Sequence, residues 1–280
     1  MNTDAWLESK IREELAPPEE ELLRVRAALD QVERRIESSD AFRIATRHPC
    51  GSFAKNTMLK GRKEADLVLV LVDAPTSQTL SELEALLSRN MPGLQRVNTQ
   101  WKAVSLHFDN GVTVDVLPVA RKGITSEGES IPRKLRHALS GPQHVSWFAE
   151  QSRGRPLHDV VRLLKHFRSN TPEWEPLSSF TLEVLAVAAL NGFSGRGLTR
   201  HFEEVLSRVA SGFLREGTLP QPVAPGQDLI ARLEGREKDA IEAAARRALA
   251  HLQSGTLSAV FSGSRAAPPP ATNLGGRTLA

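Results

Sequence analysis

One stretch, GSFAKNTMLKGRKEADLVLVLV at residues 51–72, constrains the fold of this chain more than any other. It ends in an unbroken run of Leu and Val, which is typical of a strand buried in the core of a sheet. We therefore predict a core strand over residues 65–73. Two carboxylates, Glu64 and Asp66, lie where that strand begins, and a Gly-Ser dipeptide opens the stretch.

The rest of the first half is mixed helix and strand. Proline and three glutamates precede apolar residues at helical spacing, which predicts a helix over 17–38. Alternating residues on both sides of Asn110-Gly111 predict a hairpin over 104–119. A further helix is expected at 77–90 and a short strand at 42–46.

After residue 130 the pattern is helical only. Helices are predicted at 156–170, 178–190, 198–214 and 238–252, whereas the tail has no periodicity and is expected to be loop or disorder. The sequence therefore predicts an α+β fold of two lobes with a cleft between them. The first, residues 1–130, is a mixed α/β lobe with a central sheet and a leading helix, and the second, residues 131–280, is a helical lobe.

Composition narrows the class of protein. The chain has 280 residues, of which 40% are hydrophobic and 25% charged, as in ordinary globular domains. No apolar run is long enough for a membrane helix, and the polar start does not resemble a secretory signal. The single cysteine, Cys50, excludes an internal disulfide and fits a reducing compartment. These features predict a cytoplasmic protein without a membrane partner.

The acidic residues point to a metal site. Glu64 and Asp66 share one face of their strand, because alternate residues of a strand point the same way. Asp115, in the second hairpin strand, would join them if the two strands are neighbours. Three clustered carboxylates need a cation, and their hard oxygens suit Mg²⁺, for which Mn²⁺ can substitute. The alternative is that they are solvated residues at strand ends.

The Gly51-Ser52 turn complements these acids. Glycine allows close approach of the backbone to a phosphate, which backbone N–H groups and the serine hydroxyl can hold. A Gly-Ser turn, an acid-x-acid pair on a strand and a third acid on a later strand are the pattern of the polymerase-β-like nucleotidyltransferases. This resemblance implies a bilobal enzyme in which Glu64, Asp66 and Asp115 are catalytic metal ligands.

Further motifs resemble those of the oligoadenylate synthetases. The stretch 51–72 has the family's order of GS, K-x-T, L-x-G-R and an acid-Ala-Asp-Leu-Val run, and residues 114–119 resemble its third-acid segment. By this resemblance Lys165 contacts a triphosphate, Phe180 stacks on a base, and Ser179 binds a triphosphate oxygen or caps its helix. From the residues alone, Lys165 would be a solvated lysine and Phe180 a core residue. The tail motif at 270–276 resembles a P-x-x-NLGG sequence.

The wider group includes cyclic GMP-AMP synthase and the bacterial CD-NTases of anti-phage signalling. Glu64 stands where the oligoadenylate synthetases have aspartate, and cyclic GMP-AMP synthase has the same Glu-x-Asp order. The resemblance implies template-independent synthesis of a linear or cyclic oligonucleotide second messenger from NTPs, ATP among them. It also implies an RNA or protein activator and an effector that binds the product. Two alternatives are an inactive scaffold with this fold and an RNA-tailing nucleotidyltransferase.

Overall fold

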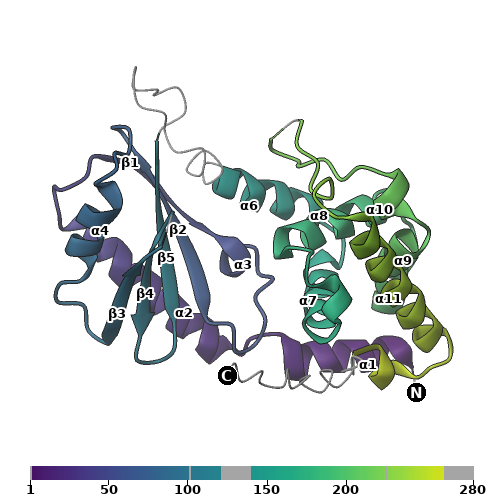
Figure 1. Ribbon diagram of the computed structural model, residues 1–280. Coiled ribbons are helices and arrows are strands. Elements are labelled where there is room, and N and C mark those ends of the chain that lie inside the picture. Colours follow the sequence, from purple (N-terminus) through teal and green to yellow (C-terminus); the bar gives the residue numbers. More distant parts are fainter. Residues whose placement is uncertain (1, 101, 121–139, 225, 262–280) are drawn as a thin grey trace, which may run out of the picture.

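A computed structural model describes residues 2–100, 102–120, 140–224 and 226–261. It has two lobes, a sheet with helices and an assembly of helices (Figure 1). Among the described residues, no helix has the length and apolar character needed to cross a membrane. The tail motif at 270–276 and the boundary near residue 130 lie outside the described residues.

The sheet has five strands in the order β1-β2-β5-β4-β3. Its central pair, β2 and β5, is parallel, and every other neighbouring pair is antiparallel. The strands are β1 (Ile44–Cys50), β2 (Glu64–Leu71), β3 (Leu94–Thr99), β4 (Val104–Phe108) and β5 (Thr113–Ala120). The predicted core strand and the predicted hairpin are therefore confirmed. β3 has no counterpart among the predicted elements.

The two faces of the sheet are covered by different helices. On one face, α2 (Glu19–Glu37) and α4 (Thr79–Leu87) pack against apolar residues of β2, β4 and β5. On the other face, Val68 of β2 and Leu117 of β5 form a smaller cluster with Cys50, against which α6 (Ser140–Gln151) packs. That second face carries the alternate residues of β2 that begin at Glu64.

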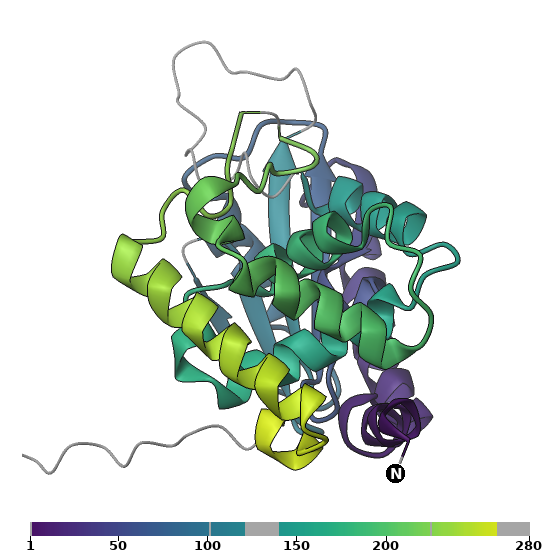
Figure 2. The same ribbon diagram turned by 90° about the vertical axis from the view of Figure 1, so that its right-hand side faces the viewer.

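Figure 2 shows the helices of the helical lobe in front of the sheet. This lobe has its own core. Its helices are α7 (Leu157–Asn170), α8 (Ser179–Leu190), α9 (Leu198–Ala210), α10 (Phe213–Glu216), α11 (Gly235–Gln253) and α12 (Leu257–Phe261), with a 3-10 turn at Pro172–Trp174. The helix predicted at 198–214 is divided into α9 and α10 at Gly212, which has a left-handed backbone.

The beginning of the chain joins this helical core. α1 (Thr3–Lys10) continues into a short π-helix, Ile11–Leu15, and both run beneath the helical lobe before α2 passes along the sheet (Figure 1). Leu7, Ile11 and Leu15 are buried among the residues of α7 to α12. The first forty residues therefore contact both lobes.

Candidate active site between the lobes

Two carboxylates lie opposite each other at the centre of the sheet. The parallel register of β2 and β5 places Asp66 beside Asp115, and both side chains are partly exposed on the face that α6 covers further along. Glu64, the first residue of β2, is exposed and pairs with Thr113. The expectation that Asp115 lies on a strand next to the acid pair is thus met in the structure.

The Gly-Ser turn lies directly against Asp66. Cys50, the last residue of β1, pairs with Asp66, and the chain then turns into a short helix, α3 (Gly51–Ala54). Gly51 has φ +68°, and a Cβ atom built on it would lie 1.7 Å from Oδ2 of Asp66. Only glycine combines this conformation with such close approach. The turn and the carboxylate are therefore in contact at a position where any side chain would collide with Asp66 and strain the backbone.

The surroundings of Asp66 change its protonation. Burial raises the pKa of Asp66 to about 6, and the nearby charges of Asp115 and Glu64 act in the same direction. Oδ1 of Asp115 accepts a hydrogen bond of 2.5 Å from the buried hydroxyl of Ser105. Like charges that oppose each other's ionisation favour the binding of a cation.

The donor chemistry of the acidic pair fits a hard divalent metal. In the part of the chain that the structure describes, however, no three His, Cys, Asp or Glu side chains already surround a common metal position. The fit therefore depends on Asp66 and Asp115, which face each other, while Glu64 lies exposed at the start of the strand.

Lys165 of α7 is a buried residue, with only 5% of its surface exposed. Its ammonium donates to the carbonyl oxygen and the hydroxyl of Thr57, at 3.1 and 2.9 Å, and lies 3.5 Å from the carboxylate of Glu183. Desolvation lowers its pKa to about 8. The interpretation of Lys165 as a solvated lysine on the polar flank of its helix is wrong, because these contacts draw it into the junction between the lobes.

Glu183 also pairs with Lys55, the residue that follows α3. Sequence reasoning missed Glu183 as a site residue. Its signal was a single carboxylate within the almost wholly apolar helix α8, where a charge requires a partner. The partners come from α7 and from the segment after the Gly-Ser turn, so this cluster links the two lobes.

A second cation of α7, Arg162, contacts the segment that follows the Gly-Ser turn. Arg162 donates to the carbonyl and side-chain oxygens of Asn56, at 2.8 and 2.9 Å, and to the carbonyl of Met58 at 3.4 Å. Asn56 has a positive φ of 51°, so its backbone needs such support. Arg162, like Lys165, is therefore buried on this helix.

Phe180 lies near these lysines. Its ring stacks on His144 of α6 with the centroids 4.0 Å apart, and the ammonium of Lys55 lies 5.5 Å from its centroid. Trp147 meets the same ring edge-on. Burial lowers the pKa of His144 to about 4, so this imidazole is neutral at pH 7. Phe180 is thus a partly exposed ring among aromatic and cationic neighbours.

Ser179 has a different neighbour from the one expected of a cap. Ser178 is the N-cap of α8, because its hydroxyl accepts the N–H of Thr181 at 3.0 Å. The hydroxyl of Ser179 instead accepts a hydrogen bond of 3.2 Å from Arg168. The structure therefore assigns the cap to the preceding residue.

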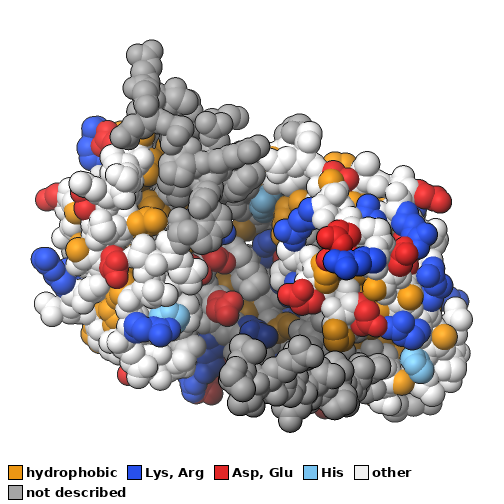
Figure 3. All heavy atoms as spheres, viewed as in Figure 1, with side chains coloured by type: hydrophobic (Ala, Val, Ile, Leu, Met, Phe, Trp, Pro, Cys, Tyr) orange, Lys and Arg blue, Asp and Glu red, His pale blue; other side chains and the backbone are white. Residues whose placement is uncertain are grey.

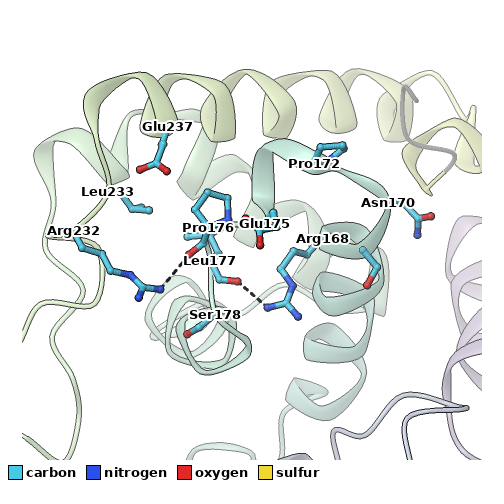
Figure 4. Close-up of a pocket in the computed structure, with 11 residues that line it drawn as sticks. Arg168, Asn170, Pro172, Glu175, Pro176, Leu177, Ser178, Arg232, Leu233 and Glu237 are labelled. Carbon is cyan, nitrogen blue, oxygen red and sulfur yellow. Dashed lines mark hydrogen bonds between the residues drawn. The ribbon is translucent and has the colours of Figure 1, made fainter. Parts of the chain in front are cut away.

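Arg168 also borders a pocket of about 1020 Å³ in the helical lobe (Figure 4). Arg168 donates to the carbonyl of Leu177, and Arg232, on the opposite side, donates to that of Pro176. None of the acidic pair, Gly51 or Lys165 lines this pocket. Lys165 instead contacts Thr57, in the segment after the Gly-Ser turn. The space-filling view is hollowed between the lobes, with acidic side chains on the side of the sheet (Figure 3).

Comparison with known proteins identifies the fold. No family model matches the sequence. Among solved structures, the chain is similar to CdnC of Escherichia coli MS115-1, in a complex with HORMA-deltaN, with a TM-score of 0.73 and 19% identity. The alignment covers 94% of this chain and 98% of CdnC.

Two further structures are similar over nearly the same length. The CD-NTase CdnG of Bradyrhizobium diazoefficiens, in complex with GTP, matches with a TM-score of 0.70 and 15% identity over 94% of this chain and 96% of its own. The Cid1 poly(U) polymerase, bound to Mg 3′-dATP, matches with a TM-score of 0.71 and 13% identity. The alignment covers 93% of this chain and 98% of the polymerase. The chain therefore has the bilobal polymerase-β-like nucleotidyltransferase fold, as its motifs predicted.

Proposed function

We propose that this chain is a metal-dependent, template-independent nucleotidyltransferase that makes a linear or cyclic oligonucleotide second messenger from NTPs. The observation that carries the proposal is the pairing of Asp66 with Asp115 across β2 and β5, with Gly51 against the carboxylate of Asp66. Asp66, Asp115 and Glu64 would hold Mg²⁺, or Mn²⁺ in its place. A metal bound there supplies positive charge that activates the attacking hydroxyl and stabilises the leaving pyrophosphate.

The remaining residues bind and orient the nucleotide. Gly51 and Ser52 offer backbone N–H groups and a hydroxyl to the phosphates beside the acidic pair. Lys165 adds positive charge and Ser179 a hydroxyl from the helical lobe. Phe180 provides a ring on which a base stacks. Holding both substrates between two lobes converts a bimolecular reaction into one between oriented groups, which is the main contribution of such a site.

The role in signalling rests on two similarities. The sequence motifs resemble those of the oligoadenylate synthetases, and the fold is shared with CdnG, solved with GTP, and with CdnC, solved with HORMA-deltaN. We infer that ATP is among the substrates and that the product is an antiviral or anti-phage signal, made in the cytoplasm. A protein or RNA activator and an effector that binds the product belong to the same proposal.

RNA tailing is a second candidate, and the shared fold of the Cid1 poly(U) polymerase favours it. The two reactions use the same acidic residues and differ in the acceptor, which is RNA in one and a nucleotide in the other. An inactive scaffold is a third reading, although it gives no reason for the retained contact of Gly51 with Asp66.

The test is an incubation of the purified protein with radiolabelled ATP, GTP, CTP and UTP and Mg²⁺ or Mn²⁺. Parallel reactions contain double-stranded RNA, a single-stranded RNA acceptor, or the variant Asp66→Ala. Phosphatase-resistant small products that the variant fails to make support a signal synthase. Label found only in the RNA acceptor supports tailing instead. No product under any of these conditions weakens the proposed function and favours the inactive scaffold.

A further inference from the structure

Three buried charges meet where the lobes join. The ammonium of Lys55 contacts one oxygen of Glu183, and the ammonium of Lys165 lies 3.5 Å from the other. None of the three side chains is more than 8% exposed. Two cations therefore share one anion, and among the described residues no other acidic side chain lies within 4 Å of either ammonium.

The two lysines are not equally satisfied. Lys165 has the carbonyl and hydroxyl oxygens of Thr57 as close acceptors, at 3.1 and 2.9 Å. For Lys55, the acceptor in its hydrogen-bond contacts is Glu183, since its other close neighbour is the face of Phe180. A buried cation needs a hydrogen-bonded anion to offset its desolvation. Glu183 is therefore mainly the partner of Lys55. Because two ammonium groups lie beside one carboxylate, the cluster has a net charge of one positive unit.

The position of Lys55 relates this excess charge to the nucleotide. Lys55 follows the Gly-Ser helix α3, and its ammonium lies 5.5 Å from the centroid of Phe180. Burial and the neighbouring acids raise the pKa of Asp66, and the charge of Lys55 opposes that rise. The same charge acts on His144, which stacks on Phe180. The ammonium thus lies beside the ring proposed to stack on a base, at the end of the short helix that starts with the Gly-Ser turn.

We propose that the carboxylate of Glu183 occupies, in the free protein, the place of a phosphate on Lys55, and that the phosphate chain of the nucleotide displaces it. The inference rests on the proposed function and extends it by assigning Lys55 to the phosphates and Glu183 to competition with them. Glu183 is then a positioning residue. Its negative charge stabilises the two buried lysines when no nucleotide is bound. The same charge lowers the affinity of the lysines for an incoming anion.

Two effects of opposite sign follow for Glu183→Gln. Without the carboxylate, two buried ammoniums repel each other in the free protein, so its melting temperature falls. An added anion then has no competitor and neutralises more charge, so it binds more tightly, by about tenfold. A residue with a purely structural role would lower the melting temperature and leave anion affinity unchanged or weaker.

The experiment measures binding of inorganic tripolyphosphate by calorimetry, without nucleotide or metal, to wild type, Lys55→Met and Glu183→Gln. Lys238→Met and Glu82→Gln are matched controls, because Lys238 lies in α11 and Glu82 is exposed on α4. We expect Lys55→Met to weaken binding by about tenfold or more, since it removes a buried cation. Glu183→Gln should tighten it, and neither control should change it.

Tighter binding by Glu183→Gln supports the proposal whether or not the protein turns over NTPs. Failure of this proposal can therefore be distinguished from failure of the proposed function. Equal or weaker binding by this variant overturns the proposal, as does absence of tripolyphosphate binding to wild type or unchanged binding by Lys55→Met. If Glu183→Gln does not fold, Glu183→Asp replaces it. The shorter carboxylate holds Lys55 less well, so tightening by a smaller factor is expected, and equal or weaker binding again contradicts the proposal.

Discussion

Asp66 and Asp115 are direct partners across the parallel β2–β5 ladder, although they are 49 positions apart in the chain. A parallel pair fixes the relative position of its residues as firmly as a hairpin does, but it needs a long crossover connection. Here that connection contains α4, β3 and β4. The two aspartates therefore come together only when the whole sheet lobe is folded. Substitutions of side chains that leave the β2–β5 pairing intact can test the function of the site.

Gly51 is the position where a single methyl group should matter most. Gly51→Ala would place a Cβ atom 1.7 Å from Asp66 Oδ2 and would impose a positive φ on a residue with a side chain. We expect activity to fall by about 100-fold or more and stability by about 1–3 kcal/mol, measured by NTP turnover and urea unfolding.

Gly61→Ala is the matched control for Gly51→Ala. Gly61 also has a positive φ, of 80°, but a Cβ atom there would have no neighbour within 4 Å. It should share the loss of stability that comes from the backbone and keep most of the activity. Equal activity of the two variants would contradict the close contact between Gly51 and Asp66.

Asp66 should make stability depend on pH in the absence of metal. Its pKa is raised to about 6 in the folded protein, whereas the unfolded chain has the ordinary value near 3.8. The folded state therefore binds more protons between these values, and stability falls as pH rises from about 4 to 6 and stays lower above. Asp66→Asn removes this loss and should stabilise the metal-free protein at pH 7 by about 3 kcal/mol.

Urea unfolding in EDTA from pH 4 to pH 8 measures this effect, and a second series contains Mg²⁺. Added Mg²⁺ should stabilise wild type at pH 7 and leave Asp66→Asn unchanged, because a ligand stabilises only the protein that binds it. Parallel stability curves for the two proteins in EDTA would be inconsistent with the raised pKa of Asp66.

Arg162 should support the segment that follows the Gly-Ser turn. Arg162→Lys keeps the charge but loses the fork of donors in which Nη2 reaches both oxygens of Asn56 and Nε reaches the carbonyl of Met58. We expect a loss of about 1–2 kcal/mol in unfolding free energy and lower turnover, since the turn and Lys55 are displaced together. Arg153→Lys, at an exposed position, is the control. If both variants match wild type in stability and turnover, this role of Arg162 is wrong.

Phe180 should act on binding more than on chemistry. Phe180→Ala removes the ring that stacks on His144, and a base–aromatic stack contributes about 1–3 kcal/mol. KM for ATP should therefore rise about tenfold while kcat changes little, as determined from initial rates. Phe193→Ala, which removes a partly buried ring beside His201, controls for a general loss of packing. A fall in kcat with unchanged KM would argue against stacking.

Much of the fold was predictable because the local signals are strong. The unbroken apolar run of β2 and the Asn110-Gly111 turn each have one dominant structural solution, and both are confirmed. α1, β3 and α6 were missed. The pattern of β3 is mostly polar, since it lies at the edge of the sheet, and α1 is polar except for the face that it buries in the helical lobe.

The polar part of the site was harder to predict. The pairing of Asp66 with Asp115 followed from strand periodicity and one assumption about neighbouring strands. The contacts of Glu183 with Lys55 join residues 128 apart in sequence, and no local rule connects them. The same long-range contacts bury Lys165, which periodicity places on the polar side of its helix. The pattern within one helix thus does not predict whether a charged side chain is buried, because burial depends on its partners in other elements.

The most direct test of the central claim is the rate at which labelled ATP is converted in Mg²⁺ by wild type, Asp115→Asn and Asp73→Asn. Asp73 is exposed beyond the end of β2 and pairs with Arg43 at the surface, so it controls for loss of one carboxylate. The account predicts that Asp115→Asn lowers the rate by about 1,000-fold with an unchanged melting profile, and that Asp73→Asn has no effect. Undiminished conversion by Asp115→Asn would contradict it.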